Sequence, residues 1–239
     1  MASTAPARAR RRPRPGRPRK LDYEDVIAAA FEVMNDEGFS TLSMRSLAKK
    51  LGIAHGNLYT YVGHIEDVEA EVLKRLLERL PAPSTDPAGP AALRAELITF
   101  LHATRKVLFQ HPHVMYPPIG SPAWVSFGKL TTQWISALAR HESDARAVAV
   151  GFTALIAHVA SHAQRERLVG PDHLARNLQA WRKTFQAHPA LVEIERMARH
   201  GAEAALTQIF ETLIDRLFPA LEQTARAPHA RRARTGSKS

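Results

Sequence analysis

The chain has 239 residues, a mass of 26.5 kDa, 33 basic and 23 acidic side chains, and no cysteine. Its length allows a small domain and a larger one, each with a core of its own. The lack of cysteine excludes disulfide frameworks, cysteine-ligated zinc and thiol catalysis. Because the longest apolar run, residues 145–160, is interrupted by Arg146 and His158, we expect no membrane span and a cytoplasmic protein.

The net charge of +10 is concentrated at the two ends of the chain. Residues 1–20 carry eight basic and no acidic side chains, and residues 226–239 carry five basic and no acidic side chains. The part between them is therefore slightly acidic. This distribution places the main electrostatic attraction for nucleic acid in the two ends.

Residues 1–20 form a Pro- and Arg-rich arm without apolar periodicity, so we expect it to be disordered when free. Its PGRPRK run at residues 15–20 resembles the AT-hook pattern, in which extended Arg-Pro segments enter a narrow minor groove. Arg17, Arg19 and Lys20 are the candidate DNA contacts of this run. The alternative is a solvated basic tail that attracts phosphates without specificity.

A first helix is predicted from Asp22, which can cap it together with Asp25, to Gly38, which can end it. Apolar residues recur along one face of this segment at helical spacing. The opposite face is acidic and would repel DNA. We therefore expect this helix to support a DNA-reading unit from the side that faces away from the phosphates.

Residues 42–68 read as a helix, a tight turn and a second helix. Ser43 can cap the first of these helices, and Gly52 can end it in a left-handed conformation. In the second helix, Leu58 and Val62 lie four residues apart on one face. Such a unit places its second helix in the major groove, where side chains near its N-terminus meet base edges.

The same stretch resembles the N-terminal domain of the TetR family of ligand-responsive transcriptional repressors. The resemblance rests on Gly38-Phe39, on LSMRSLAKKLGI at residues 42–53 and on AHGNLYTYV at residues 54–62. One departure is Ile65, which occupies a position where the family often carries a phosphate-binding lysine. His64 is the candidate to replace that contact.

The resemblance implies which side chains meet DNA. Asparagine suits bidentate reading of adenine, and arginine suits guanine. For the two tyrosines, the alternative is that one ring packs against the small core. The candidate base or groove readers are Arg45, His55, Asn57 and Thr60, and the candidate phosphate contacts are Ser43, Lys50, Tyr59, Tyr61 and His64.

The rest of the chain reads as helices separated by Pro- and Gly-rich breaks, which predicts an all-α protein. The predicted helices are residues 65–80, 91–109, 124–139, 145–168, 174–185 and 191–218. The predicted parts are a disordered basic arm (1–20), a homeodomain-like three-helix DNA-binding domain (21–65), a linking helix (66–80), a linker (81–90), a helical effector-binding and dimerisation domain (91–222) and a disordered basic tail (223–239).

The family resemblance implies that the second domain forms a homodimer and binds a small molecule. The helices at residues 145–168 and 191–218 are the candidate dimer helices, with Gly151 and Ala154 allowing close approach; the alternative is that both are plain core. Aromatic residues at helical spacing are also often plain core. The candidate pocket residues are Phe100, Thr104, Phe109, Met115, Trp124, Phe127, Trp134, Phe152 and His158.

Two histidine pairs, His158 with His162 and His111 with His113, could share a metal, but no carboxylate accompanies them, so core or interface histidines are expected and no metal. The chain has no nucleophile elbow or phosphate-binding loop, so we expect that it is not an enzyme.

The predicted function is a homodimeric, sequence-specific repressor that binds a pseudo-palindromic double-stranded operator and is released by a small-molecule effector. The alternative is an architectural or nucleoid-type DNA-binding protein without effector control.

Overall fold

The computed structural model describes residues 21–85, 88–113, 120–170, 192–193, 196 and 199–222, and in this part of the chain every regular element is helical. The predicted all-α class is confirmed. The elements are α1 (Tyr23–Glu37), the 3-10 turn η1 (Phe39–Thr41), α2 (Met44–Leu51), α3 (His55–Leu58), α4 (Ile65–Leu77), α5 (Pro90–Gln110), α6 (Ala123–Ala139), α7 (Ala145–Val169), α10 (Ala202–Leu217) and α11 (Pro219–Glu222).

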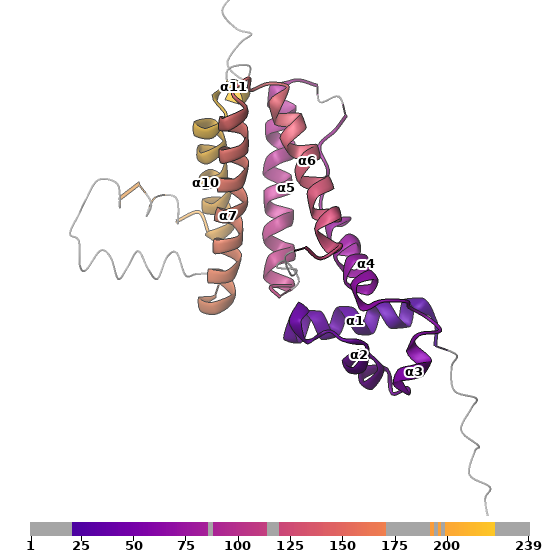
Figure 1. Ribbon diagram of the computed structural model, residues 1–239. Helices are drawn as coiled ribbons and strands as arrows, with labels where there is room; N and C mark the ends of the chain where they lie inside the picture. The colour runs from indigo at the N-terminus through magenta and orange to yellow at the C-terminus, as the bar shows by residue number, and fades with distance from the viewer. Residues whose placement is uncertain are drawn as a thin grey trace, which may run out of the picture.

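The helices form a small unit and a tall bundle that α4 joins (Figure 1). Helices α1, α2 and α3 lie together at one end, with α1 across the foot of the bundle. Helices α5, α7 and α10 stand side by side, and α6 leans from α5 towards α4. Helix α4 packs against both α1 and α6, so it joins the small unit to the bundle.

Local signals begin and end the helices of the small unit as predicted. The Asp22 side chain accepts the Asp25 N–H at 2.9 Å, and Asp25 accepts the Asp22 N–H at 3.1 Å, which completes a capping box for α1. Ser43 caps α2 by accepting the Ser46 N–H at 3.1 Å. Gly52 ends α2 at φ +68°, a left-handed conformation that costs glycine little. These bonds fix the angle at which α3 leaves α2.

Polar contacts between distant residues hold the bundle helices in register. Arg94 on α5 makes a two-pronged ion pair with Asp215 on α10, at 2.7 and 3.1 Å. Arg105, further along α5, lies 2.7 Å from Glu166 on α7 and 2.6 Å from Glu203 on α10. Planar guanidinium groups suit such paired contacts with carboxylates. Helix α5 is thus tied to α10 near both of its ends and to α7 near its C-terminal end.

Two expectations about the bundle need correction. The predicted helix at residues 191–218 is interrupted: Val192, Glu193 and Arg196 are helical, but a turn at Arg199 and His200 leads into Gly201 at φ +95°, and α10 begins only at Ala202. Gly151 does not face outward to meet a second copy. It is buried, and the Phe218 ring of the same chain packs against it. The predicted helix at residues 174–185 lies outside the described residues.

Helix α7 is long and apolar enough, by length and composition alone, to cross a membrane. Core helices of soluble proteins pass the same test, so one such helix is weak evidence for a span. In this structure α7 packs against α5, α6 and α10. Only 33% of the residues in its most apolar stretch are buried, so much of α7 is left uncovered in one copy of the chain.

One carboxylate is buried where α4 meets the start of α6. Glu69 on α4 is 7% exposed, and the Ser121 hydroxyl donates to it at 3.4 Å. The same hydroxyl accepts the Ala123 N–H at 3.2 Å. Burial, with a smaller contribution from Glu66, raises the pKa of the Glu69 carboxyl above its ordinary value of 4.5.

We expect Glu69→Gln to stabilise the fold at pH 7. A carboxyl whose pKa is raised by folding holds its proton more tightly in the folded state, so wild-type stability falls as pH rises from about 4.5 through the raised pKa. Glutamine cannot ionise, so the variant should not lose stability at this site as pH rises. Thermal unfolding of the wild type and the variant between pH 4 and pH 8 measures the difference. Glu66→Gln, which removes an acid from the first turn of α4, should leave stability unchanged or slightly lower at pH 7. A Glu69→Gln variant less stable than wild type at pH 7 contradicts the expectation.

Candidate nucleic-acid interface and ligand groove

The reading surface is the exposed side of α3 and of the turn after it. His55, Asn57, Tyr59 and Thr60 are exposed, whereas Leu58 between them is fully buried. The α-helix is shorter than the predicted second helix, since it covers only His55–Leu58. Turns continue the chain through residues 59–61, and the Thr60 hydroxyl donates to the Asn57 carbonyl at 2.7 Å. Four polar or aromatic side chains therefore face outward from a short helix that the buried Leu58 anchors in the core.

The two tyrosines of this surface have different surroundings. The Tyr59 side chain is 55% exposed, and its ring meets His55 edge to face with 5.4 Å between the ring centres. Tyr61 is half-buried and packs against the hydrophobic core. Tyr59 is therefore freer to meet a phosphate, and Tyr61 matches the alternative in which one ring supports the core.

The basic residues of the unit are partly engaged with α1. Arg45 and Lys49 are exposed on α2, whereas the Lys50 ammonium lies 2.8 Å from the Glu32 carboxylate of α1. Both partners are largely exposed, so the pair is weak and can open when a phosphate approaches. Lys49 was not among the predicted site residues, although its exposure makes it a further candidate phosphate contact. Ser43 and His64 are also exposed.

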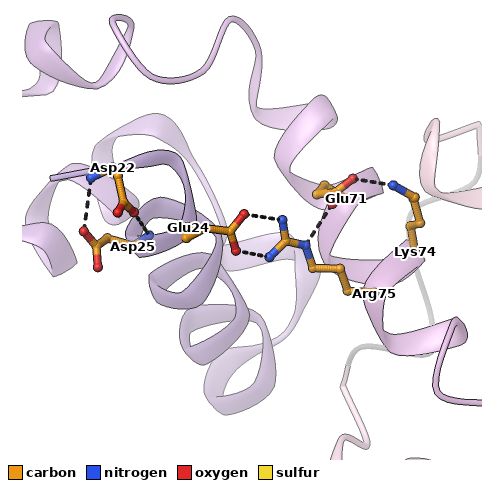
Figure 2. A network of polar contacts seen from close by, with 6 residues as sticks. All are labelled: Asp22, Glu24, Asp25, Glu71, Lys74 and Arg75. Carbon is orange, nitrogen blue, oxygen red and sulfur yellow. Dashed lines mark hydrogen bonds and ion pairs between the residues drawn. The ribbon is translucent and has the colours of Figure 1, made fainter.

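An ion-pair network fastens the small unit to α4 (Figure 2). Arg75 on α4 lies between two carboxylates: its Nη2 donates to Glu24 of α1 at 2.9 Å and its Nε donates to Glu71 at 2.8 Å. Lys74 also reaches Glu71, at 3.2 Å. The acidic face of α1 therefore meets α4 at this point, and the network helps to set the angle between them. Sequence reasoning missed it because the partners Glu24 and Arg75 lie 51 residues apart.

A second contact joins the small unit to the end of α5. His111 Nδ1 lies 3.0 Å from the Asn35 side-chain oxygen, and the His111 ring meets Phe31 edge to face. The Arg79 guanidinium lies over the Phe31 ring, 5.5 Å from the ring centre. Burial and the nearby Arg79 charge lower the pKa of His111. The α1 helix is thus held to the bundle at two places, through α4 and through His111.

The bundle has a groove between α6 and α7 of about 500 Å³. Two of the predicted pocket residues, Phe127 of α6 and Phe152 of α7, line it. Its volume is in the range of small-molecule sites. The lining residues are Phe127, Thr131, Phe152, Thr153, Ile156, Ala157, Ala160, Ser161 and Gln164.

The other predicted pocket residues do not line this groove. Phe100 and Trp134 are buried in the core with their ring centres 4.7 Å apart, and Thr104 is buried near them on α5. His158 faces Phe210 of α10. Phe109 and Trp124 are partly exposed. Met115 and the arm residues Arg17, Arg19 and Lys20 lie outside the described residues.

The two histidines of α7 are half-buried. The rings of His158 and His162 are 6.4 Å apart, and burial lowers the pKa of His158. Within the described residues, no three potential ligands come together in a way that could hold a metal ion.

The sequence profile of the bacterial regulatory proteins of the tetR family matches residues 26–67, from α1 to the first turn of α4. These residues therefore carry the sequence pattern of the TetR-family N-terminal domain. A relative, the HTH-type transcriptional repressor DrrR1 of Streptomyces coeruleorubidus, is 32% identical over 129 residues, which are 51% of this chain and 46% of the relative. An HTH-type transcriptional regulator of Saccharopolyspora erythraea is 34% identical over 94 residues, which are 38% of each chain. The chain thus spans less than half the length of these relatives.

The fold is shared with a solved TetR-family structure. The TetR family protein ActR of Streptomyces coelicolor, crystallised in complex with (S)-DNPA, superposes with a TM-score of 0.54 at 22% sequence identity. The similarity covers 83% of this chain and 98% of that one. The small unit followed by a helical bundle is therefore a fold that this chain shares with ActR.

Proposed function

We propose that the protein is a homodimeric, sequence-specific transcriptional repressor that works in the cytoplasm and leaves its operator when a small molecule binds the helical bundle. The observation that carries the proposal is the reading surface, where exposed His55, Asn57 and Thr60 stand on a buried Leu58. This is the arrangement that a helix-turn-helix needs to present side chains to base edges.

We propose a dimer because of the size of that surface and the exposed face of α7. A single short reader meets few base pairs, whereas a two-fold pair reads two half-sites about 34 Å apart. The outer face of α7 offers exposed small and apolar residues, among them Val150 (58% exposed), Ala154 and Ala157. We propose that this face and α10 meet their copies across the two-fold axis.

Effector control is supported by the groove and by a relative. ActR, which shares the fold, has been crystallised with (S)-DNPA. A bound effector can release DNA only if it favours one arrangement of the two readers over the other, typically by 1–3 kcal/mol. We propose α4 as the part that carries the change, because it packs against α6 on one side and α1 on the other.

The basic arm adds affinity that does not depend on sequence. Between residues 43 and 64 the charged side chains are Arg45, Lys49 and Lys50, a small number for DNA binding. We propose that Arg17, Arg19 and Lys20, which lie outside the described residues, supply further attraction for the phosphates or the minor groove.

A gel-shift titration tests the proposal. At physiological salt the full chain should bind the DNA that flanks its own gene at least about a thousandfold more tightly than random DNA of the same length. Equal affinity for the two DNAs would overturn the repressor function and favour the architectural one.

A further inference from the structure

Among the described residues, those that line the groove between α6 and α7 carry no charged side chain. Its walls are aromatic, aliphatic, hydroxyl or amide groups. We propose that this groove binds an uncharged, flat and largely apolar effector, and that the second copy of the chain closes its open side. The inference rests on the proposed function, because it names the class of effector and the way the dimer takes part.

The floor of the groove is a rigid aromatic surface. Phe152 is 4% exposed, and its ring lies nearly parallel to Phe100, with 6.3 Å between the ring centres and 16° between the planes. Phe100 in turn packs on the fully buried Trp134. Because two further rings back it, the Phe152 ring cannot easily turn away from the edge of the groove that it lines. The half-buried Phe127 of α6 lines the same groove, and aromatic ligands gain from contacts with such rings beyond simple burial.

The polar groups of the groove lie on its walls and rim. Thr131 contributes a hydroxyl from α6, and the exposed Thr153, Ser161 and Gln164 contribute hydroxyl and amide groups from α7. These groups can hydrogen-bond carbonyl or hydroxyl groups along one edge of a ligand. They cannot neutralise a full charge, and burying a charge without a partner is costly. The lining therefore selects an uncharged ligand.

The open side of the groove coincides with the proposed dimer face. Thr153, Ala157, Ser161 and Gln164 line the groove and are also exposed on α7, spaced by three or four residues. Val150 and Ala154 are exposed near the start of the same stretch. A second copy seated on this face of α7 would cover the rim of the groove. Each copy then completes the other's site, and ligand binding and dimer formation strengthen each other by the same factor.

Two dyes with one skeleton test the class of ligand. Purified full-length protein is titrated with N-phenyl-1-naphthylamine, which is uncharged, and with 1-anilinonaphthalene-8-sulfonate, which carries a sulfonate, and dye fluorescence is measured. We expect the uncharged dye to bind at least about tenfold more tightly. Equal affinities, or tighter binding of the sulfonate, would overturn the proposal.

Variants show whether the dye occupies this groove. Ala160→Phe fills the groove and should weaken binding of the uncharged dye by about tenfold or more. Ser161→Glu adds a charge at the exposed rim and should act in the same direction if Ala160→Phe does not fold. The matched control is Ser126→Phe, in the separate groove between α4 and α6 whose lining includes Lys74, Glu78 and Lys129. The proposal fails if the control weakens dye binding as much as the α6–α7 variants do.

The part played by the second copy is tested without DNA. Saturating uncharged dye should shift the monomer–dimer equilibrium towards the dimer in sedimentation velocity, by roughly fivefold or more in the dissociation constant. Val150→Glu, outside the groove lining, should weaken the dimer and lower dye affinity at concentrations where monomer prevails. Monomer that binds the dye as tightly as dimer would overturn closure by the second copy. Because no operator is involved, these results are separate from the gel-shift result.

Discussion

Gly151→Val should lower the free energy of unfolding by about 1–3 kcal/mol or more, because there is no room for a side chain at this position. A Cβ atom built on Gly151 would lie 2.8 Å from Cζ and 3.1 Å from Cε1 of Phe218. Phe218 is itself fully buried, so its ring can yield only by disturbing the packing where α7 meets the end of α10. Thermal and chemical denaturation measure the loss.

Gly128→Val in α6 is the matched control for this change. A Cβ at Gly128 would meet nothing within 4 Å. The variant should therefore be neutral or gain a few tenths of a kcal/mol, because valine is a better helix former than glycine. Phe218→Leu should partly restore Gly151→Val, so that the double change costs less than the sum of the two single changes. Equal losses at the two glycines would show that the contact with Phe218 does not limit position 151.

Asn57→Ala should remove preference at one base pair in each half-site, at a cost of about 1–3 kcal/mol for each. The reason is that the exposed Asn57 stands on the reading surface, where its amide can both donate to and accept from a base edge. Affinity for random DNA should stay unchanged. Fluorescence anisotropy with the operator, with single-base operator variants and with random duplex measures the difference.

Two changes around Lys50 provide the contrast. Lys50→Ala should weaken binding to all sequences alike and reduce the dependence of affinity on salt. Glu32→Gln should act in the opposite direction, because the carboxylate 2.8 Å from the Lys50 ammonium competes with phosphate for it. If Lys50→Ala changed base preference as Asn57→Ala does, or if Glu32→Gln weakened binding, this division of roles would be wrong.

Local sequence was enough to predict the small unit because its boundaries depend on residues close together in the chain. Asp22 and Ser43 each cap a helix by bonding to the residue three positions later, and Gly52 takes the left-handed conformation that ends α2. Leu58 and Val62 were predicted on one face, and both are buried. Such signals act within one or two helical turns, so they can be read without knowledge of the fold.

Contacts between distant residues could not be predicted in the same way. The sequence identified Gly151 as a small residue but did not show that Phe218, 67 residues later, occupies the space beside it. It identified Lys50 as basic but not that Glu32 is its neighbour. It suggested nine pocket residues, whereas packing buried Phe100 and Trp134 in the core and left Phe127 and Phe152 in one groove.

The sequence by itself determined the all-α class and the helix-turn-helix with its family resemblance, and it named the polar side chains of α3 that are candidates to meet DNA. Only the tertiary structure decided which of these side chains are exposed and which are paired or buried. It also decided how α4 packs between α1 and α6, and where the bundle has a groove for a ligand. The physical reason is that capping and helical periodicity act over a few residues. Burial, ion pairing and cavity shape instead depend on which helices meet and at what distance.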